Sequence, residues 1–525
     1  MAHQASNILE PVAPVSWPVS RHRARRILVP DLSFCVSAVT LVYCILLFNA
    51  PQALFRDSDT GWHLVTGARI LNDHQLPTTD PYSFTRAGQP WFAWEWASDS
   101  LMALANQAAG LAGVVWLFVL AIAAVTWLWF QLTWSVGGNF FLACAFAAPM
   151  LSTVNLHWLA RPHIFSWLLL VGAIWYFEQS PAQFRKRDAV VLAAASALWT
   201  NLHASFVLLP LVALIYAIAH FVRPLIWHTD TAMDVRKGRW FLLATVIASA
   251  ATLLNPYGWN LHAHVARYLL DGELIDRIGE FQSFNFHTLG AGQILLALGL
   301  AAIGGILALA QRKLAHFLLA AVLIAMALRS ARGLPIVALV LLPLANGAIA
   351  DALRKAHDLR LGLRHALNSF LAYSDRLRLL DARFSGVVLA PLVAVLLLLW
   401  LQAPAVASHT GFPSDQFPVT AANELTLLPQ NIRLLAPDKY GGYLIFRFAG
   451  ERKVFFDGRS DFYGSAFMKQ YIRMVEVRPG WQEQLQRFGF THALLPNDYS
   501  LVPALEQLGW KVLFRDDVAT LLARG

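Results

Sequence analysis

The feature that most constrains this chain is a series of long apolar runs. A helix needs roughly 20 apolar residues to cross the hydrocarbon core of a bilayer, and about eleven runs approach that length. They span residues 32–54, 112–134, 138–157, 162–179, 188–203, 205–227, 240–255, 291–310, 314–329, 333–350 and 386–403. The sequence therefore predicts an α-helical polytopic membrane protein.

Composition supports this class. Charged residues make up 14% of the chain and hydrophobic residues 57%, whereas a soluble domain carries about 25% charged residues. There are too few charges to cover the surface of a soluble enzyme of this length, and too few for a disordered chain. The three cysteines all lie inside apolar runs, which excludes a disulfide scaffold.

The formal charge of +9 is distributed unevenly among the loops. Cytoplasmic loops of membrane proteins carry an excess of Lys and Arg. This rule predicts a cytoplasmic N-terminus and, with eleven spans, a C-terminus outside. We therefore interpret the charge as a topology signal, and expect membrane lipids rather than nucleic acid as partners. The basic cytoplasmic segments are the head (Arg21, Arg23, Arg25, Arg26), 185–187, 223–239, 312–313 and 351–385.

These assignments predict three parts: a cytoplasmic head (1–31), a membrane domain (32–403) with outside loops at 55–111 and 256–290, and an outside tail (404–525). Within the first loop we expect helices over 60–72 and 97–111. In the tail, short β-like runs alternate with helical stretches at 463–476, 480–488 and 500–508, which predicts a small extracytoplasmic α/β domain of a size that can fold alone. The β-like runs are 432–436, 443–448, 453–457, 493–496 and 511–514.

Polar side chains are costly at membrane depth, so their position is informative. On the predicted topology they all fall at the outer ends of the spans, whereas the inner ends carry mostly Lys and Arg. This segregation predicts a polar chamber open to the outside. Its candidate residues are Asp57, Asp59, His63, Glu95, Arg161, His163, Asn201, His203 and Glu280.

Asp57 and Asp59 follow the first apolar run directly. Residues i and i+2 share one face of an extended segment, so the two carboxylates could together bind a divalent cation such as Mg²⁺ or Mn²⁺. Alternatively, one acts as a general base. The plainer interpretation is a helix cap with solvated charge.

Glu95 lies among Trp91, Trp94 and Trp96. An apolar environment raises the pKa of a carboxyl group and suits it for acid/base catalysis. The alternative is an aromatic belt with one solvated acid.

The Arg161-Pro162-His163 sequence opens an apolar run. A guanidinium group there could bind a phosphate with two hydrogen bonds, or it could extend to the interface as many helix-end arginines do. Asn201 and His203 are more typical of packing and capping groups. In the tail, Arg459 belongs either to a tight turn or to a site for the acceptor.

The layout of these residues resembles the GT-C superfamily of integral-membrane glycosyltransferases, which includes oligosaccharyltransferases and protein O-mannosyltransferases. The similarity lies in the long first loop that opens on an acidic motif, the many spans and the soluble tail. Several short elements resemble a bacterial subgroup: 57–63, 77–85, Trp94-Glu95-Trp96, Arg161-Pro162-His163, Asn201-Leu202-His203, Tyr440 to Tyr443 and Asp457-Gly458-Arg459.

The resemblance implies transfer of a sugar, with inversion, from a polyprenyl-phosphate donor to a lipid, glycan or protein acceptor. The reaction would occur at the outer face of the bacterial cytoplasmic membrane. A first-loop aspartate would be the base, with Asp57 the best match and Asp59 next. Oligosaccharyltransferases of the superfamily bind a divalent metal, whereas several relatives need none, so the resemblance leaves metal dependence open.

Two other functions are compatible with the layout. A transporter or flippase for a lipid-linked substrate would need polar residues through the whole membrane, and usually repeat symmetry. A non-catalytic assembly protein would use the tail to bind envelope partners. Polarity at one face and the absence of a sequence repeat favour the enzyme.

Overall fold

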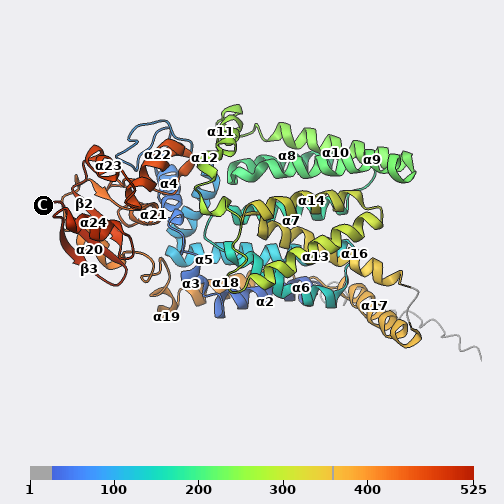
Figure 1. Ribbon diagram of the computed structural model, residues 1–525. Coiled ribbons are helices and arrows are strands. Elements are labelled where there is room, and N and C mark those ends of the chain that lie inside the picture. Colours follow the sequence, from blue (N-terminus) through green and yellow to red (C-terminus); the bar gives the residue numbers. More distant parts are fainter. Residues whose placement is uncertain (1–25, 357–359) are drawn as a thin grey trace, which may run out of the picture.

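The computed structural model describes residues 26–356 and 360–525, so most of the predicted head, with Arg21, Arg23 and Arg25, lies outside the described residues. The protein is elongated. A bundle of helices forms one part, and the tail (404–525) sits at one end of it, as Figure 1 shows.

Within the described residues, six helices are long and apolar enough to cross a membrane. Four of them are α5 (Trp96–Ser135), α6 (Phe140–Val154, extended by a 3₁₀ turn over Asn155–His157), α9 (Leu208–Trp227) and α13 (Ala291–Ala310). The others are the span Arg26–Leu46, which contains α2 (Leu32–Leu46), and the span Gly333–Arg354 with α15 (Gly333–Ile336) and α16 (Leu342–Arg354). A multi-pass membrane protein is therefore confirmed.

The five remaining apolar runs are also helical, but none meets both the length and the hydropathy expected of a span. Three are apolar but short, and the other two carry charged residues in their first halves, so the number eleven stays a prediction. They are α7 (His163–Glu178), α8 (Lys186–Leu202), α10 (Thr231–Ala251), α14 (Leu314–Arg329) and α18 (Leu389–Leu401).

Two helices of the first long loop (55–111) agree with the sequence-based prediction. After the short α3 (Ala50–Ala53), α4 runs over Asp59–Asp73, and the region from 96 forms the start of the 40-residue α5. The α5 helix is kinked at Ala109 and Gly110, where Gly110 has φ +61°. Glycine has no Cβ and adopts this conformation at little cost, so the kink separates the loop segment from the apolar part.

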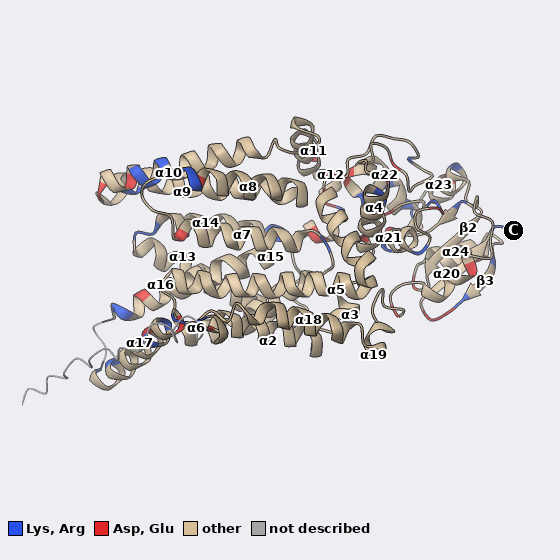
Figure 2. Cartoon of the chain, turned by 180° about the vertical axis from the view of Figure 1, so that it is seen from behind, with Lys and Arg blue, Asp and Glu red and all other residues tan. Residues whose placement is uncertain are grey.

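The basic residues of the bundle gather at the end opposite the tail. Figure 2 shows them around the α9–α10 turn, at the end of α16 and along α17 (Leu361–Asp381). At the tail end, the second long loop (256–290) forms α11 (Trp259–Leu270), α12 (Gly272–Ile275) and a 3₁₀ turn over Gly279–Phe281. The two ends of the bundle therefore differ in charge, as the loop pattern predicts.

The tail begins with α19 (Pro404–Ala407) and forms a four-stranded sheet of order β1-β2-β4-β3. Strand β1 (Leu434–Leu435) pairs in parallel with β2 (His492–Pro496), whereas β4 (Ala519–Ala523) pairs antiparallel with β2 and with β3 (Lys511–Arg515). The small α/β architecture is confirmed. The helices are α20 (Val419–Leu425), α21 (Asp438–Arg447), α22 (Ser460–Val475), α23 (Trp481–Phe488) and α24 (Leu501–Gln507).

Two of the predicted tail strands are wrong, and strand β4 was not predicted. Residues 443–448 belong mostly to helix α21, and 453–457 forms only a single bridge between Val454 and Ser83. Helix α21 approaches α4 closely. A Cβ at Gly442 would lie 2.2 Å from the carbonyl oxygen of Ser58, and a Cβ at Gly61 would lie 2.1 Å from that of Gly442. The glycines let the two helices touch through their backbones.

The tail shares a hydrophobic core with the first long loop. Trp62, Tyr82 and Trp91 from the loop pack with buried tail residues such as Tyr440 and Leu494. The boundary at residue 404 remains a prediction. The shared core holds the loop and the tail together as one body at one end of the bundle.

Candidate functional site

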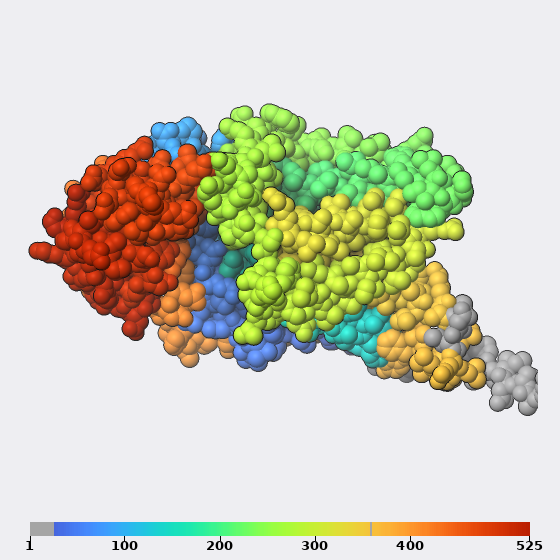
Figure 3. All heavy atoms as spheres, viewed as in Figure 1, coloured from blue at the N-terminus to red at the C-terminus, as the bar shows by residue number. Residues whose placement is uncertain are grey.

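A cavity of about 660 Å³ lies where the first long loop, the second long loop, the bundle and the tail meet. Figure 3 shows the surface hollowed between the tail and the segment around residue 270. Seven of the predicted site residues line it: Asp59, Glu95, Arg161, His163, His203, Glu280 and Arg459.

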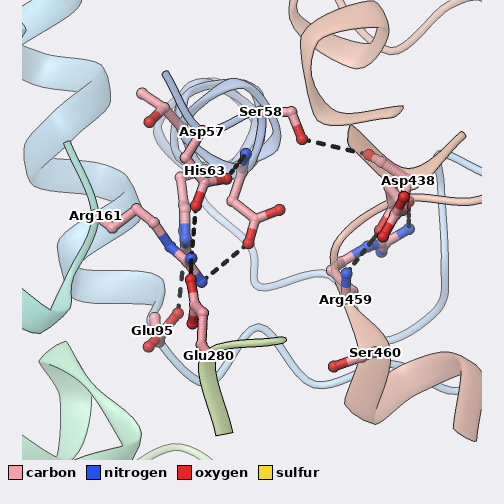
Figure 4. Close-up of polar contacts among 12 residues, drawn as sticks. Asp57, Ser58, His63, Glu95, Arg161, Glu280, Asp438, Arg459 and Ser460 are labelled. Atoms are coloured by element: carbon pink, nitrogen blue, oxygen red, sulfur yellow. Dashed lines mark hydrogen bonds and ion pairs between the residues drawn. The ribbon is translucent and has the colours of Figure 1, made fainter. Parts of the chain in front are cut away.

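Arg161 is the centre of the polar cluster. Its guanidinium donates from Nη1 to Asp57 at 2.8 Å and to Glu280 at 2.9 Å, and Nη2 lies 2.9 Å from a carboxylate oxygen of Asp59. Figure 4 shows the side chain extending toward α4, with Glu280 approaching from the second long loop. Burial alone would lower the pKa of Arg161, but the carboxylates around it raise it above its ordinary value. The side chain is therefore a fixed cation.

Backbone contacts set the position of Arg161. The Ala160 N–H donates to the carbonyl of Leu54 at 2.9 Å, and the Thr60 hydroxyl donates to the carbonyl of Ala160 at 3.0 Å. Pro162 follows and begins the turn into α7, a position where its missing N–H costs nothing. The loop before α7 is thus tied both to the end of the first span and to α4.

Asp57 and Asp59 do not share an extended segment, contrary to the sequence-based expectation. Asp59 is the first residue of α4, and its N–H donates to the Asp57 carboxylate at 2.9 Å. Both carboxylates nevertheless meet at Arg161. Burial, opposed by Arg161, raises the pKa of Asp59 to about 7. Asp59 lines the cavity and Asp57 does not, so the structure brings Asp59 rather than Asp57 to the open space.

Glu280 connects Arg161 to a second arginine. Nε of Arg332 donates to the other Glu280 carboxylate oxygen at 2.6 Å, and the Arg332 guanidinium lies 4.4 Å from the ring centre of Phe281. Although burial opposes it, the two arginines lower the pKa of Glu280 well below its ordinary value. Arg332 lines the cavity with 37% of its side chain exposed, so a substrate can reach it.

Glu95 forms a separate acidic group on the cavity wall. His63 Nε2 lies 3.8 Å and His203 Nε2 lies 3.5 Å from its carboxylate oxygens. Burial raises the pKa of Glu95 to about 8, although Arg161 opposes the shift. Burial and then Arg161 lower the pKa of His63, and burial lowers that of His203 to about 3. At neutral pH this group is a neutral acid between two neutral imidazoles.

His63 is oriented from behind by Asp99. Its Nδ1 contacts the Asp99 carboxylate at 2.5 Å, and both side chains are buried. His63 does not line the cavity. An Nδ1–H donated to Asp99 leaves Nε2 as the nitrogen that faces Glu95.

The tail supplies the opposite wall. A Cβ at Gly458 would lie 1.8 Å from a carboxylate oxygen of Asp59, so only a glycine fits there. The next residue, Arg459, donates to Asp457 and, through Nη2 at 2.8 Å, to Asp80 of the first long loop. All three side chains are at most 2% exposed. Arg459 therefore joins the tail to the loop, as well as reaching the cavity.

Two other predicted residues have structural contacts. Asn201 accepts from the indole N–H of Trp96 at 2.8 Å and donates to the carbonyls of Ala197 and Leu254, and it does not line the cavity. His163 contacts the carbonyl of His157 through Nε2 at 2.7 Å while one side of its ring faces the cavity.

The lower wall of the cavity is apolar. From the charged cluster, the cavity extends between helices α7, α9, α14 and α15, and it reaches about two turns along α7. A space with charged groups at one end and hydrocarbon walls at the other is suited to a ligand that is itself part polar and part lipid. The apolar lining includes Trp167, Leu170, Leu208, Met326 and Ile336.

Sequence reasoning missed Asp80, Asp99 and Arg332. For Arg332 a signal existed, because an arginine in a short loop at the less basic end departs from the distribution of the others. Asp80 lies in the 77–85 element of the resemblance, whereas Asp99 carries no such signal. The contact partner of Asp99 is His63, 36 residues away in the chain, and that of Asp80 is Arg459, 379 residues away.

The residues at Asp57 and Asp59 do not fit a divalent cation as they are arranged. Magnesium and manganese bind carboxylate oxygens directly, but here the oxygens of Asp57, Asp59 and Glu280 are directed at the guanidinium of Arg161. Among the residues that the structure describes, no group of three or more His, Cys, Asp and Glu side chains is arranged to hold a metal ion.

No protein-family model matches the sequence, and no curated protein matches it. Among solved structures, the chain is similar to the Archaeoglobus fulgidus oligosaccharyltransferase tethered to an acceptor peptide containing the NVT sequon, with 13% identity and a TM-score of 0.53. The match covers 91% of this chain and 69% of that one.

It is also similar to the archaeal oligosaccharyltransferase AglB from the same organism in complex with an inhibitory peptide and a dolichol-phosphate. There the identity is 12%, the TM-score is 0.54, and the match covers 89% of this chain and 69% of that one. At such identities the likeness shows the fold. The resemblance to the GT-C superfamily, predicted from the layout of the loops and spans, is confirmed at that level.

Proposed function

We propose that this protein with the fold of a GT-C glycosyltransferase transfers a sugar from a polyprenyl-phosphate donor to a hydroxyl-bearing or amide-bearing acceptor. The observation that carries the proposal is the cavity itself. Asp59, Glu95 and Arg332 line one end, and apolar side chains of the bundle line the other. The structurally similar oligosaccharyltransferase AglB was solved in complex with a dolichol-phosphate, which supports a lipid phosphate as the leaving group.

In the proposed reaction the acceptor attacks the anomeric carbon of the donor. The bond from that carbon to the phosphate oxygen breaks, and the sugar is inverted. Asp59 takes the acceptor proton, because its pKa of about 7 leaves a useful fraction ionised at neutral pH. Arg332 stabilises the charge of the departing phosphate.

Glu95 has a different proposed role. With a pKa of about 8 it keeps its proton at neutral pH, so it can donate a hydrogen bond to the sugar or the acceptor. The imidazoles of His63 and His203 lie 3.8 and 3.5 Å from its carboxylate oxygens. Asp57 contributes indirectly, because it orients Arg161 and the start of α4.

We place the site at the outer face of a bacterial cytoplasmic membrane, with the N-terminus in the cytoplasm and the tail in the periplasm. The support is the gathering of basic residues at the opposite end of the bundle.

The transporter alternative has less support. The structure has a second cavity of about 310 Å³ at the basic end, lined by residues such as Glu178 and Lys313, and it shares no lining residue with the first. A transport path would need polar groups that connect the two. The assembly-protein alternative does not require a buried carboxyl with a pKa near 7, which is typical of active sites.

The test uses the full chain in lipid nanodiscs. Polyprenyl phosphate, the expected product, should raise the melting temperature, whereas polyprenol without phosphate should not. Asp59→Asn should abolish release of polyprenyl phosphate from polyprenyl-phosphate sugars yet still bind the product. Asp73→Asn, at the exposed end of the same helix, is the matched control. Equal stabilisation by polyprenol and its phosphate would contradict the proposal.

A further inference from the structure

The three carboxylates around Arg161 form an arrangement that ordinarily calls for a cation. Asp57 and Asp59 open the first long loop and Glu280 lies in the second, and each places a carboxylate oxygen 2.8 or 2.9 Å from the same guanidinium. Without a cation between them, these partly buried charges would repel one another, and their burial would carry a large energetic penalty.

We propose that Arg161 is the resident cation of this site, in place of a divalent metal, and that the protein acts without one. The inference rests on the proposed function for its catalytic meaning. Its structural content, a site that excludes metal because an arginine occupies it, stands on the contacts alone.

The geometry supports an occupied site. Two guanidinium nitrogens engage three carboxylates, and this planar fork matches carboxylates better than a lysine could. A metal ion could bind these carboxylates only if the Arg161 guanidinium moved away. The backbone next to Arg161 is held by the Ala160–Leu54 and Thr60–Ala160 hydrogen bonds.

The charges of the cluster are consistent with this role. Arg161 and Arg332 face the carboxylates of Asp57, Asp59 and Glu280, which leaves one excess negative charge when Asp59 is ionised. When Asp59 accepts a proton, the cluster becomes neutral. Arg161 is thus a positioning residue that acts on the reaction through Asp59 and does not contact the sugar. Its charge opposes the effect of burial on the pKa of Asp59, so the carboxylate can ionise.

The experiment measures metal binding directly. Full-length protein in nanodiscs is titrated with Mn²⁺, and bound ion is followed by electron paramagnetic resonance. Wild type should show no Mn²⁺ binding that depends on Asp57. Arg161→Met removes the charge and keeps an apolar chain of similar length, so it should gain the Asp57-dependent Mn²⁺ binding that wild type lacks, because the carboxylates are then without their cationic partner.

Two further variants control for other causes. Arg161→Met combined with Asp57→Asn should lose the gained Mn²⁺ binding, which locates the ion. Arg161→Lys retains a cation and should not gain the ion. If Arg161→Met fails to fold, wild type still decides the question, since Mn²⁺ bound to wild type and lost in Asp57→Asn would overturn the inference.

Activity separates this inference from the proposed function. Release of polyprenyl phosphate by wild type should be unchanged after treatment with EDTA. Transfer that stops in EDTA and returns with Mg²⁺ or Mn²⁺ would overturn the inference and leave the proposed function intact. The expected Mn²⁺ behaviour in a protein that neither binds nor releases polyprenyl phosphate would support the inference and contradict the function.

Discussion

The Cα of Gly458 is packed directly against the carboxylate of Asp59, so closely that a Cβ at 458 would lie 1.8 Å from its Oδ1. A backbone segment of the tail thereby fixes the side chain that we propose as the base. The tail is part of the site through this contact.

Gly458→Ala should therefore reduce transfer strongly. The added methyl group forces the Asp59 carboxylate away from its place, and a displacement of about 1 Å can cost about 100-fold in rate. Steady-state release of polyprenyl phosphate measures the effect. Gly299→Ala is the control, because a Cβ there meets nothing within 4 Å. A Gly458→Ala enzyme with the wild-type rate would show that the position of Asp59 is unimportant.

Glu95→Gln should stabilise the protein in alkaline solution. In the folded state the pKa of Glu95 is raised to about 8 by burial, from an ordinary value of 4.5. The folded protein thus keeps a proton that the unfolded chain has lost. The stability gained is complete below pH 4.5 and disappears as pH rises through 8.

Glutamine is neutral throughout, so the melting temperature of Glu95→Gln should exceed that of wild type above about pH 8 and match it near pH 4. Thermal denaturation in detergent across this range tests the prediction. Glu451→Gln, at an exposed position in the tail, should show no such pH-dependent difference. A constant difference at all pH values for Glu95→Gln would indicate a packing effect instead.

Asp80→Asn should weaken the joint between tail and first loop. Removing one partner of a buried ion pair costs about 3–5 kcal/mol, because the other charge remains buried. Arg459 would keep only Asp457 as an ionic partner. The melting temperature should fall markedly for Asp80→Asn. Loss of the exposed Arg515–Glu506 pair in Arg515→Gln should lower the free energy of unfolding by about 1 kcal/mol or less.

The same variant distinguishes the two interpretations of Arg459. If Arg459 only joins the tail to the loop, Asp80→Asn enzyme that remains folded should keep its KM for the acceptor. A raised acceptor KM with an unchanged donor KM would instead assign Arg459 to acceptor binding.

Arg332→Gln should impair the chemical step. Arg332 faces the cavity, and its side chain contacts Glu280 and the ring of Phe281. Losing a group that stabilises developing charge typically costs about 10²–10³ in kcat. Arg329→Gln, an exposed arginine in the same connection that does not line the cavity, is the matched control. Equal kcat values for the two variants would remove Arg332 from the mechanism.

The sequence by itself determined the class of the protein and the end of the bundle where the acidic and histidine side chains gather. Apolar runs of spanning length and the segregation of Asp, Glu and His from Lys and Arg are local properties, and bilayer physics interprets them directly. Helices 60–72 and 97–111 could be predicted for the same reason, because amphipathic periodicity and helix-start signals depend on residues that are close in the sequence.

Only the tertiary structure decided which groups meet. Arg161 lies 104 residues from Asp57 and 119 from Glu280 in the chain, and Arg459 lies 379 residues from Asp80. Asp59 rather than Asp57 lines the cavity wall, and residues 443–447 are helix rather than strand. Such pairings are set by long-range packing and burial, which no local pattern of residues encodes.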